Sequence, residues 1–280
     1  MTEIKNKVAY YQYNPEYLLK EQSYTELKIS GNKIVFFDES LAKSFKFYED
    51  KNKNWTLVFF IDSPYKKIIQ VKFSDEKPKV RNLGEGFLCH EKELSDEIVQ
   101  YSNEMLETKS LTKEDFVKTS SNGHIATVRK GFIYASETPG QFERAVLISG
   151  LAHAYKLVMN QLSESARSVS EENNTRILNV CESAAKFNIQ YYSRYPIKLE
   201  NAELRAFWEA FEGQWQISRL NDELLRQLEA MQSLLHFKES VLIAERHQNQ
   251  NIKLTIMITL AGIVFSLLST FIGHKLGWNN

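Results

Sequence analysis

A run of apolar residues near the C-terminus constrains this chain more than any other feature. From Leu254 to Ile272 the sequence LTIMITLAGIVFSLLSTFI contains no charged residue. At about 1.5 Å of rise per residue, a helix of this length comes close to crossing about 30 Å of bilayer hydrocarbon. The run predicts one transmembrane helix over 253–274, in contact with membrane lipid, and a short tail at 275–280.

The orientation of this helix follows from the other end of the chain. MTEIKNKVAYYQYNPEYLLK has scattered charges and no apolar run of signal-peptide length, so we expect the N-terminal part not to be exported. Arg246 and Lys253 precede the apolar run and Lys275 follows it, so the positive-inside rule adds little. We expect a single pass through the inner (cytoplasmic) membrane, with the N-terminal domain in the cytosol.

Charge and cysteine content argue against several classes of protein. The chain has 280 residues with 35 Lys+Arg and 35 Asp+Glu, which does not favour nucleic acid as a partner. Four Trp, 13 Tyr and 17 Phe supply enough large apolar side chains for a core in one or two units. Cys89 and Cys181 lie far apart, without a CxxC motif or a Cys/His cluster, so we expect neither a disulfide framework nor a zinc site.

The first half of the chain predicts a β-rich α/β domain over 1–138. Between Lys33 and Asp75, short runs of β-branched and aromatic residues read as strands: KIVFFDE, FKFYE, WTLVFFID and KKIIQVKFSD. The segment from Lys92 to Glu107 has apolar residues near helical spacing, and His124 to Ser136 returns to strand character.

The second half is predicted to be helical. A helical hairpin is expected over 139–196, ending before Pro196, and a long stalk helix over 197–252. After Leu199 there is no proline and only Gly213 interrupts good helix formers before the apolar run, so a continuous helix would measure on the order of 110 Å. The fold class is therefore α+β: a mixed N-terminal domain, a helical region, a stalk helix and one transmembrane helix.

The stalk carries an imperfect heptad repeat that predicts self-association. The residues assigned to it are Ile217, Leu220, Leu224, Leu228, Met231, Leu234, Leu235, Val241 and Leu242. Packing of the same stripe against the helices before Pro196 is the alternative, because a broad apolar stripe commonly faces a local core.

Small and hydroxylated residues in and just after the apolar run fall mostly on one helical face. They are Thr255, Thr259, Gly262, Ser266, Ser269, Thr270 and Gly273. Such a face lets helices approach closely, and its hydroxyls can line a narrow wet pathway, so the pattern predicts self-association and permits a pore. Alternatively, the hydroxyls bond back to their own helix and have no further role.

The C-terminal third resembles the CorA-type magnesium channels, in which long stalk helices form a pentameric pore that ends in a Gly-Met-Asn signature. HQNQNIKLTIMITL is similar to the entry of the CorA pore helix, and Gly277, Trp278 and Asn279 stand where that signature would be. Trp278 replaces the Met, and no second transmembrane helix follows, so the resemblance does not imply magnesium selectivity. CorA-like membrane proteins also act as effectors in bacterial antiviral defence, and the resemblance implies that a one-span version would suit this role.

A second resemblance is to a tail-anchored family of unknown function that includes mitochondrial and bacterial membrane scaffolds. It shares the order of β-rich region, a helix similar to FERAVLISGLAHAYKL, a heptad helix and a terminal span. This resemblance implies an oligomeric scaffold without transport activity.

No sequence motif indicates an enzyme or a cofactor. The chain lacks a phosphate-binding loop, a GxGxxG turn, a GxSxG elbow and an HExxH helix. No ligand or nucleophile spacing surrounds His90, His124 or His153, so we assign them surface or core positions. Trp208, Phe211 and Trp215 lie three and four residues apart and are expected to pack in a core, with a ligand or partner groove as the alternative.

These observations lead to one leading hypothesis and two alternatives. The first is a non-enzymatic homo-oligomer of about four to six copies, in which a cytosolic domain responds to a small ligand or protein partner and gates a pore or membrane-perturbing assembly. The second is a tail-anchored oligomeric scaffold, and the third is a membrane-tethered enzyme.

Overall fold

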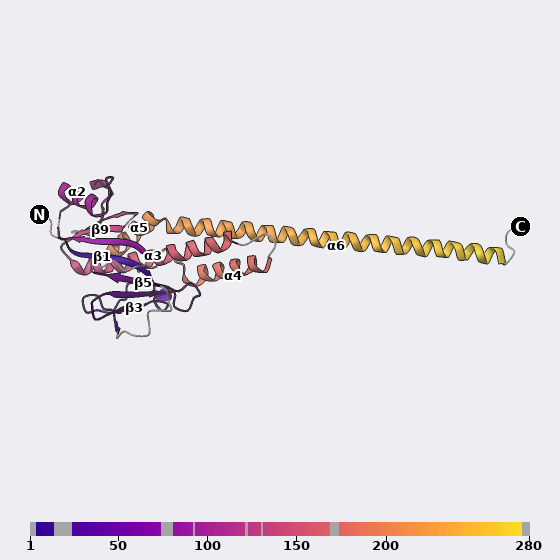
Figure 1. Ribbon diagram of the computed structural model, residues 1–280, viewed down its shortest axis with the longest axis horizontal. Helices are drawn as coiled ribbons and strands as arrows, with labels where there is room; N and C mark the ends of the chain where they lie inside the picture. The colour runs from indigo at the N-terminus through magenta and orange to yellow at the C-terminus, as the bar shows by residue number, and fades with distance from the viewer. Residues whose placement is uncertain are drawn as a thin grey trace. The chain divides into compact units, whose positions relative to one another are not determined.

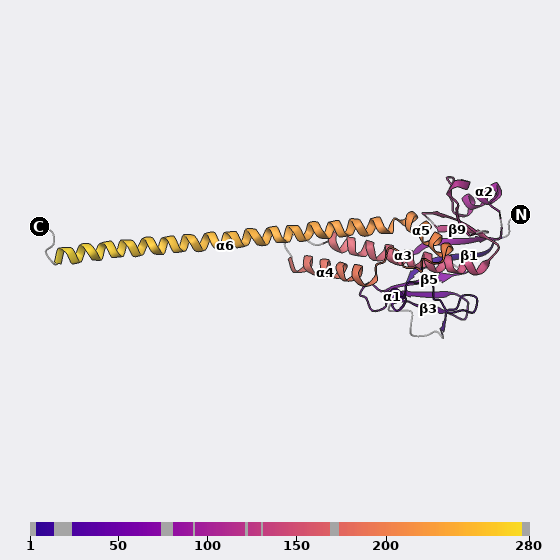
Figure 2. The same cartoon turned by 180° about the vertical axis from the view of Figure 1, so that it is seen from behind.

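The computed structural model describes residues 4–13, 24–73, 81–91, 93–120, 123–129, 131–168 and 174–275. Over these residues the fold is α+β, as predicted, with one nine-stranded mixed sheet and six α-helices. The chain divides into two compact units, Met1–Gln227 and Leu228–Asn280, and each is described by itself. The first unit contains the whole sheet and five of the helices (Figures 1 and 2).

One neighbouring pair of the described strands, β6 with β9, is parallel, and the other pairs are antiparallel. The order across the sheet is β2-β3-β4-β5-β1-β6-β9-β8-β7. The strands are β1 (Ile4–Tyr13), β2 (Thr25–Glu26), β3 (Lys46–Glu49), β4 (Trp55–Phe59), β5 (Lys67–Lys72), β6 (Asn82–Cys89), β7 (Val117–Ser120), β8 (Gly123–Val128) and β9 (Gly131–Ser136).

The helices are α1 (Glu39–Ala42), α2 (Asp96–Met105), α3 (Pro139–Arg167), α4 (Asn174–Tyr191), α5 (Ala202–Trp215) and α6 (Ile217–Lys275). A short 3₁₀ turn covers Lys113–Asp115. α2 confirms the helix predicted within 92–107, and α3 and α4 are the two helices predicted within 139–196.

Helices cover both faces of the sheet, as the contacts of β9 show, since successive side chains of a strand point to opposite faces. Phe132 points to one face, where its ring centroid lies 5.0 Å from that of Phe211 in α5. Ile133 points to the opposite face and joins a buried cluster with Ile98 of α2. Strands in the middle of the sheet are therefore buried on both sides, which explains the fully buried pattern of β9.

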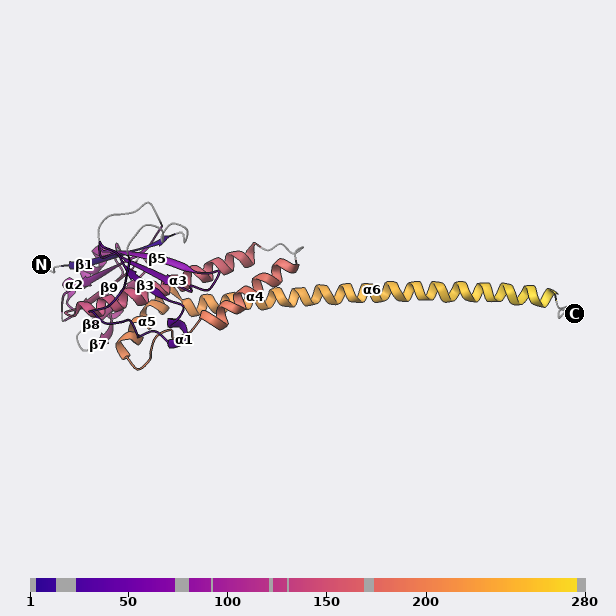
Figure 3. The ribbon, with the colours of Figure 1, turned by 90° about the horizontal axis from the view of Figure 1, so that it is seen from below.

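The helix α3 is the central element of the core and lies across the sheet (Figure 3). Buried residues lie around its whole circumference: Phe142, Ala145, Val146, Leu147, Ile148, Leu151, Ala152, Tyr155 and Val158. A helix that is apolar on all sides belongs inside a core. At Gly150 a Cβ atom would lie 2.6 Å from Leu57 Cδ1 of β4, so the glycine allows α3 to approach the sheet closely.

The expectation of one continuous helix after Leu199 is wrong, because α5 ends at Trp215 and α6 begins at Ile217. Gln216 between them has φ of 52° and ψ of 44°, the left-handed conformation in which a helix stops. The side chains on either side, Trp215 and Ile217, are both buried, and Ser218 N–H donates to Glu212 Oε1 at 3.1 Å. The burial of these two side chains holds the chain at the point where α5 ends and α6 begins. Gly213, the one residue expected to interrupt the helix, lies inside α5.

Three of the four predicted strand runs between Lys33 and Asp75 are confirmed as β3, β4 and β5, and 124–136 contains β8 and β9. The run KIVFFDE is not a strand of the sheet: only Phe37 forms an isolated bridge, to Ile197. The sequence patterns missed β1 and β6, which pair with each other in the centre of the sheet.

Candidate functional site

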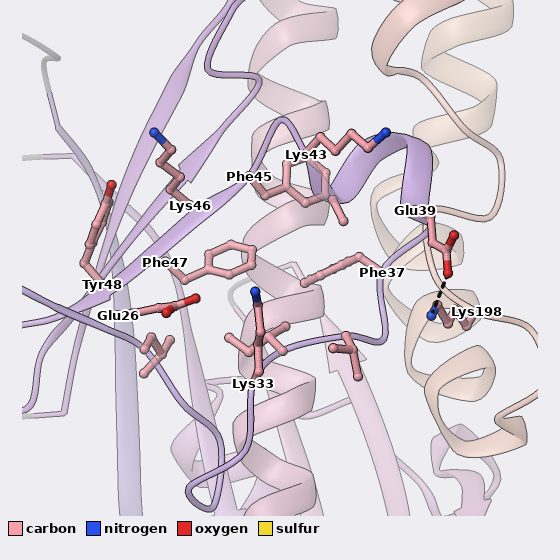
Figure 4. Close-up of a pocket in the computed structure, with 14 residues that line it drawn as sticks. Glu26, Lys33, Phe37, Glu39, Lys43, Phe45, Lys46, Phe47, Tyr48 and Lys198 are labelled. Atoms are coloured by element: carbon pink, nitrogen blue, oxygen red, sulfur yellow. Dashed lines mark hydrogen bonds and ion pairs between the residues drawn. The ribbon is translucent and has the colours of Figure 1, made fainter.

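A pocket of about 730 Å³ opens in the first unit between the segment 33–37, helix α1 and strand β3 (Figure 4). Its floor is aromatic and comes from Phe37, Phe45 and Phe47. The Phe37 ring centroid lies 5.4 Å from that of Phe45 and 5.6 Å from that of Phe47. Phe37 and Phe45 are buried and Phe47 is half-buried, so the upper surface of this ring cluster forms the bottom of an open cavity.

Lysines dominate the rim of the pocket. Lys33, Lys43, Lys46 and Lys198 line it together with two glutamates, which leaves a formal charge of two positive. Lys198 is already neutralised, because its Nζ lies 3.3 Å from the carboxylate of Glu39. Over the described residues, the other three lysines take part in no ion pair. The three remaining ammonium groups can therefore meet an incoming anion.

Figure 4 shows how these lysines are arranged around the floor. Lys33 extends its ammonium group toward the space between Phe37 and Phe47, whereas Lys43 and Lys46 lie on the opposite rim. The pocket thus presents cations on two sides of an aromatic surface.

Backbone hydrogen bonds fix the wall that carries Phe37. Asp38 N–H donates to Pro196 O at 2.9 Å, and Lys198 N–H donates to Phe36 O at 2.8 Å. The Asp38 side chain caps α1 by accepting from Ser40 N at 2.9 Å. Hydrogen bonds from Ser40, chiefly that of its hydroxyl, lower the pKa of Asp38 despite partial desolvation, and Lys198 adds to the effect. The segment between α4 and α5 therefore forms part of the pocket wall.

The sequence patterns did not single out this pocket, because its residues come from segments far apart in the chain. One signal was present: the run FKFYE places Phe45, Lys46 and Phe47 next to one another, and all three line the pocket. Lys198 is more than 150 residues downstream of Phe37, and backbone pairing of 36–38 with 196–198 brings it into the pocket.

The second candidate region is the C-terminal half of α6, in the second unit. Ten large apolar side chains there are at least half exposed: Ile252, Leu254, Ile256, Met257, Ile258, Leu260, Ile263, Val264, Phe265 and Leu268. We call residues 252–268 the apolar end of α6. A contiguous exposed apolar surface of this extent is typical of a surface that another molecule covers.

The small and hydroxylated residues predicted to form one face lie within this helix. Thr255 and Thr259 each donate a hydrogen bond of 2.8 Å to the carbonyl four residues earlier, at Asn251 and Thr255. These two hydroxyls therefore bond to their own helix, as the alternative interpretation expects. Gly262 faces open space, and Ser266 and Ser269 are exposed.

Some of the predicted residues lie beyond the part of the chain that the structure describes. Thr270 and Gly273 are in α6, but their side chains are outside the described part, as are those of Leu267 and of residues 271–275. Gly277, Trp278 and Asn279, the expected membrane-exit signature, lie outside it entirely. Among the helices of the described residues, none has the combination of length and apolarity that a membrane span requires.

The residues assigned to stalk association have two different environments. Ile217, Leu224, Leu228 and Leu235 are buried within the single chain, so they are not accessible to a second copy. Leu234, Val241 and Leu242 are exposed, and Leu220 and Met231 are half-buried. The stripe thus divides into a part that packs locally and a part that stays free.

Within the part of the chain that the structure describes, the histidines and cysteines show no arrangement suited to catalysis. His153 is buried in α3, with its ring 5.2 Å from Tyr10 and 4.3 Å from Trp215, and burial lowers its pKa to about 3. Burial, with Glu91 nearby, raises the pKa of the Cys89 thiol to about 11, which disfavours the nucleophilic thiolate. Over the described ranges, no group of three His, Cys, Asp or Glu side chains could hold a metal ion.

The chain was compared with protein-family models, with curated proteins and with solved structures, and none of them matches it. The resemblances to CorA channels and to tail-anchored scaffolds therefore stay predictions from the sequence.

Proposed function

We propose that this chain is a non-enzymatic, homo-oligomeric membrane protein. In this proposal the apolar end of α6 enters the inner (cytoplasmic) membrane, the first unit lies in the cytosol, and the assembled helices form a gated pore or a membrane-perturbing assembly. The observation that carries the proposal is the exposed apolar surface of α6. Full burial of a Leu, Ile or Phe side chain contributes about 1.5–3 kcal/mol. Transfer of the ten exposed apolar side chains from water into lipid or a protein interface is therefore strongly favourable.

The spacing of residues in the second unit supports self-association of this helix. Thr255, Thr259, Gly262, Ser266 and Ser269 follow one another at steps of four, three, four and three residues. Residues at such steps stay on the contact face of helices that wind around one another in a left-handed supercoil. We call the line formed by these five residues the seam. Small residues along a seam let helix backbones approach closely within a bilayer.

The same seam includes exposed or half-buried apolar residues nearer the middle of α6. A multiple of seven residues separates Met231 from Thr259, Leu234 from Gly262 and Val241 from Thr255, so each pair has the same heptad position. One face of α6 is therefore apolar in its first part and small or hydroxylated in its apolar end. This continuity suits parallel association of several copies of the chain, about four to six if the ring closes.

The hydroxyls of Thr255 and Thr259 already donate to their own helix, so they do not donate to a neighbouring helix or to permeating water. Their oxygens can still accept hydrogen bonds. A pore along this seam would be narrow and only weakly polar, which favours a leak over a selective channel.

Replacement of Thr259, Gly262 and Ser266 by leucine tests the proposal. Leucine fills the seam and prevents close approach of the helices, so dye release from vesicles containing the variant should fall to the level of protein-free vesicles. The matched control replaces Ile256, Ile263 and Val264 by leucine, outside the seam, and should release dye like the original chain.

The outcomes of this experiment separate the candidates. Unchanged dye release by a variant that still inserts would contradict a pore along the seam. If the original chain inserts and releases no dye under any condition, the tail-anchored scaffold becomes the better description.

A further inference from the structure

We propose that the pocket between the segment 33–37, α1 and β3 binds an organic anion that carries a flat, apolar ring system. The ring lies on the phenylalanine floor, and the acidic group lies among the unpaired lysines of the rim. The role of such a ligand as the signal that controls the membrane assembly rests on the proposed function, whereas its binding does not.

The dimensions and lining of the pocket suit a small organic molecule. Sites for such ligands commonly enclose about 300–1,000 Å³ and combine a mainly apolar lining with a few polar groups. The pocket, at about 730 Å³, falls within this range. The phenylalanine rings favour a flat aromatic ligand, because offset-stacked and edge-to-face contacts form between two aromatic rings.

The charges of the pocket favour an anion with two negative charges. Its four lysines and two glutamates leave two positive charges. Lys198 is paired with Glu39, which leaves Lys33, Lys43 and Lys46 for the ligand. Ammonium groups bind phosphate and similar groups as point charges from several directions, and Lys33 faces the other two across the floor (Figure 4).

The pocket wall is hydrogen-bonded to the segment that links α4 to α5 in the same unit. The wall at 36–38 bonds to the backbone at Pro196 and Lys198, between α4 and α5. A ligand that draws Lys33 toward Lys43 or Lys46 would act on this wall and on the segment that leads into α5. This effect of the ligand stays within the first unit, since α5 and the start of α6 belong to that unit.

Binding is measured on the full-length chain in nonionic detergent by isothermal titration calorimetry. Two flat dianions, 2-naphthyl phosphate and 4-nitrophenyl phosphate, are compared with 2-naphthol and with inorganic phosphate. We expect at least one aryl phosphate to bind with a Kd below about 1 mM, and at least about tenfold more tightly than 2-naphthol or phosphate alone, because both parts of the pocket contribute. If neither aryl phosphate binds more tightly than those two fragments, the proposal is overturned.

Two pairs of variants place the binding in this pocket. Val35 is 62% exposed on the pocket wall, so Val35→Glu should fold and repel the anion, whereas Val35→Thr keeps the β-branched shape. We expect a loss of about tenfold or more in affinity for the glutamate variant and little change for the threonine variant. Equal affinity in both variants would contradict this location.

The second pair tests the cations. Replacement of Lys33, Lys43 and Lys46 by glutamine should weaken binding of the aryl phosphates by at least about tenfold. The same change at the exposed residues Lys51, Lys109 and Lys118 alters net charge equally and should leave binding unchanged. A similar effect of both triple variants would mean that general charge, and not this pocket, attracts the anion.

Dye release and ligand binding are separate readouts, so the two proposals can fail independently. Pocket-dependent binding to a chain that never releases dye would keep the binding site and remove the proposed function. Dye release that depends on the seam, without binding of any aryl phosphate, would do the reverse.

Discussion

The full-length chain with both Leu260→Lys and Val264→Lys is expected to stay in the unbound fraction when it is floated with neutral phosphatidylcholine vesicles. Each charge near the centre of a membrane-inserted helix costs about 2.5–3.5 kcal/mol, so the two substitutions together remove most of the inserted population. Both side chains are more than half exposed in the second unit, so the core of the first unit is not disturbed. The original chain should float with the vesicles.

The control for this experiment carries the same added charge outside the apolar end. Gln248→Lys and Asn251→Lys change two exposed polar residues that precede it, and this variant should float like the original chain. Far-UV circular dichroism checks that all three proteins keep their helices. Equal flotation of the two double variants would show that the apolar end does not hold the chain on the vesicle.

The substitution Gly131→Ala is expected to destabilise the first unit by about 3 kcal/mol or more. Gly131 begins β9 and pairs with Glu85 of β6, the parallel pair in the middle of the sheet. A Cβ atom at this position would lie 1.8 Å from the carbonyl oxygen of Glu85, which is backbone and cannot rotate away. The alanine variant must therefore separate β6 from β9, or lose part of the β9 pairing.

Gly213→Ala is the matched control, because a Cβ atom there meets nothing within 4 Å and the residue lies inside α5. Alanine in a helix interior is favoured over glycine by about 1 kcal/mol, so this variant should be slightly more stable than the original chain. Urea unfolding followed by tryptophan fluorescence measures both changes. Similar unfolding midpoints for Gly131→Ala and the original chain would mean that the sheet tolerates a side chain at this position.

Local composition predicted strands that are rich in β-branched and aromatic residues, but it missed β1 and β6 at the centre of the sheet. β4 and β5 are runs of β-branched and aromatic residues, and both were expected. β6, with the sequence NLGEGFLC, contains two glycines, which weaken any strand pattern. One of them has a tertiary reason that the sequence does not reveal: a Cβ atom at Gly86 would lie 2.5 Å from the Phe132 ring of β9.

The segment KIVFFDE shows the opposite failure. It has the composition of a strand, but among the described residues it forms only one bridge, to Ile197, and its wall position depends on a segment more than a hundred residues away. The pocket could not be predicted from the sequence for the same reason, since its wall forms only when these two distant segments meet. By contrast, the helical spacing of Trp208, Phe211 and Trp215 was sufficient to predict their burial, which the structure confirms.

The candidate residues in α6 could be predicted only in part from their spacing. Heptad positions predict that a face is apolar, but they do not say whether the same chain or a second copy covers it. Leu228 and Leu235 are buried in the single chain, whereas Leu234 and Val241, only one and six residues from Leu235, are exposed. Self-association through the exposed residues of the stripe stays a prediction.

The most direct test of self-association through α6 is the mass of the full-length chain in detergent, compared with that of a chain truncated after Arg246. Analytical ultracentrifugation with detergent-matched buffer gives both masses. We predict a closed oligomer of about four to six copies for the full-length chain, and a smaller or dissociating species for the truncated one. A monomer in both samples would contradict the proposed assembly.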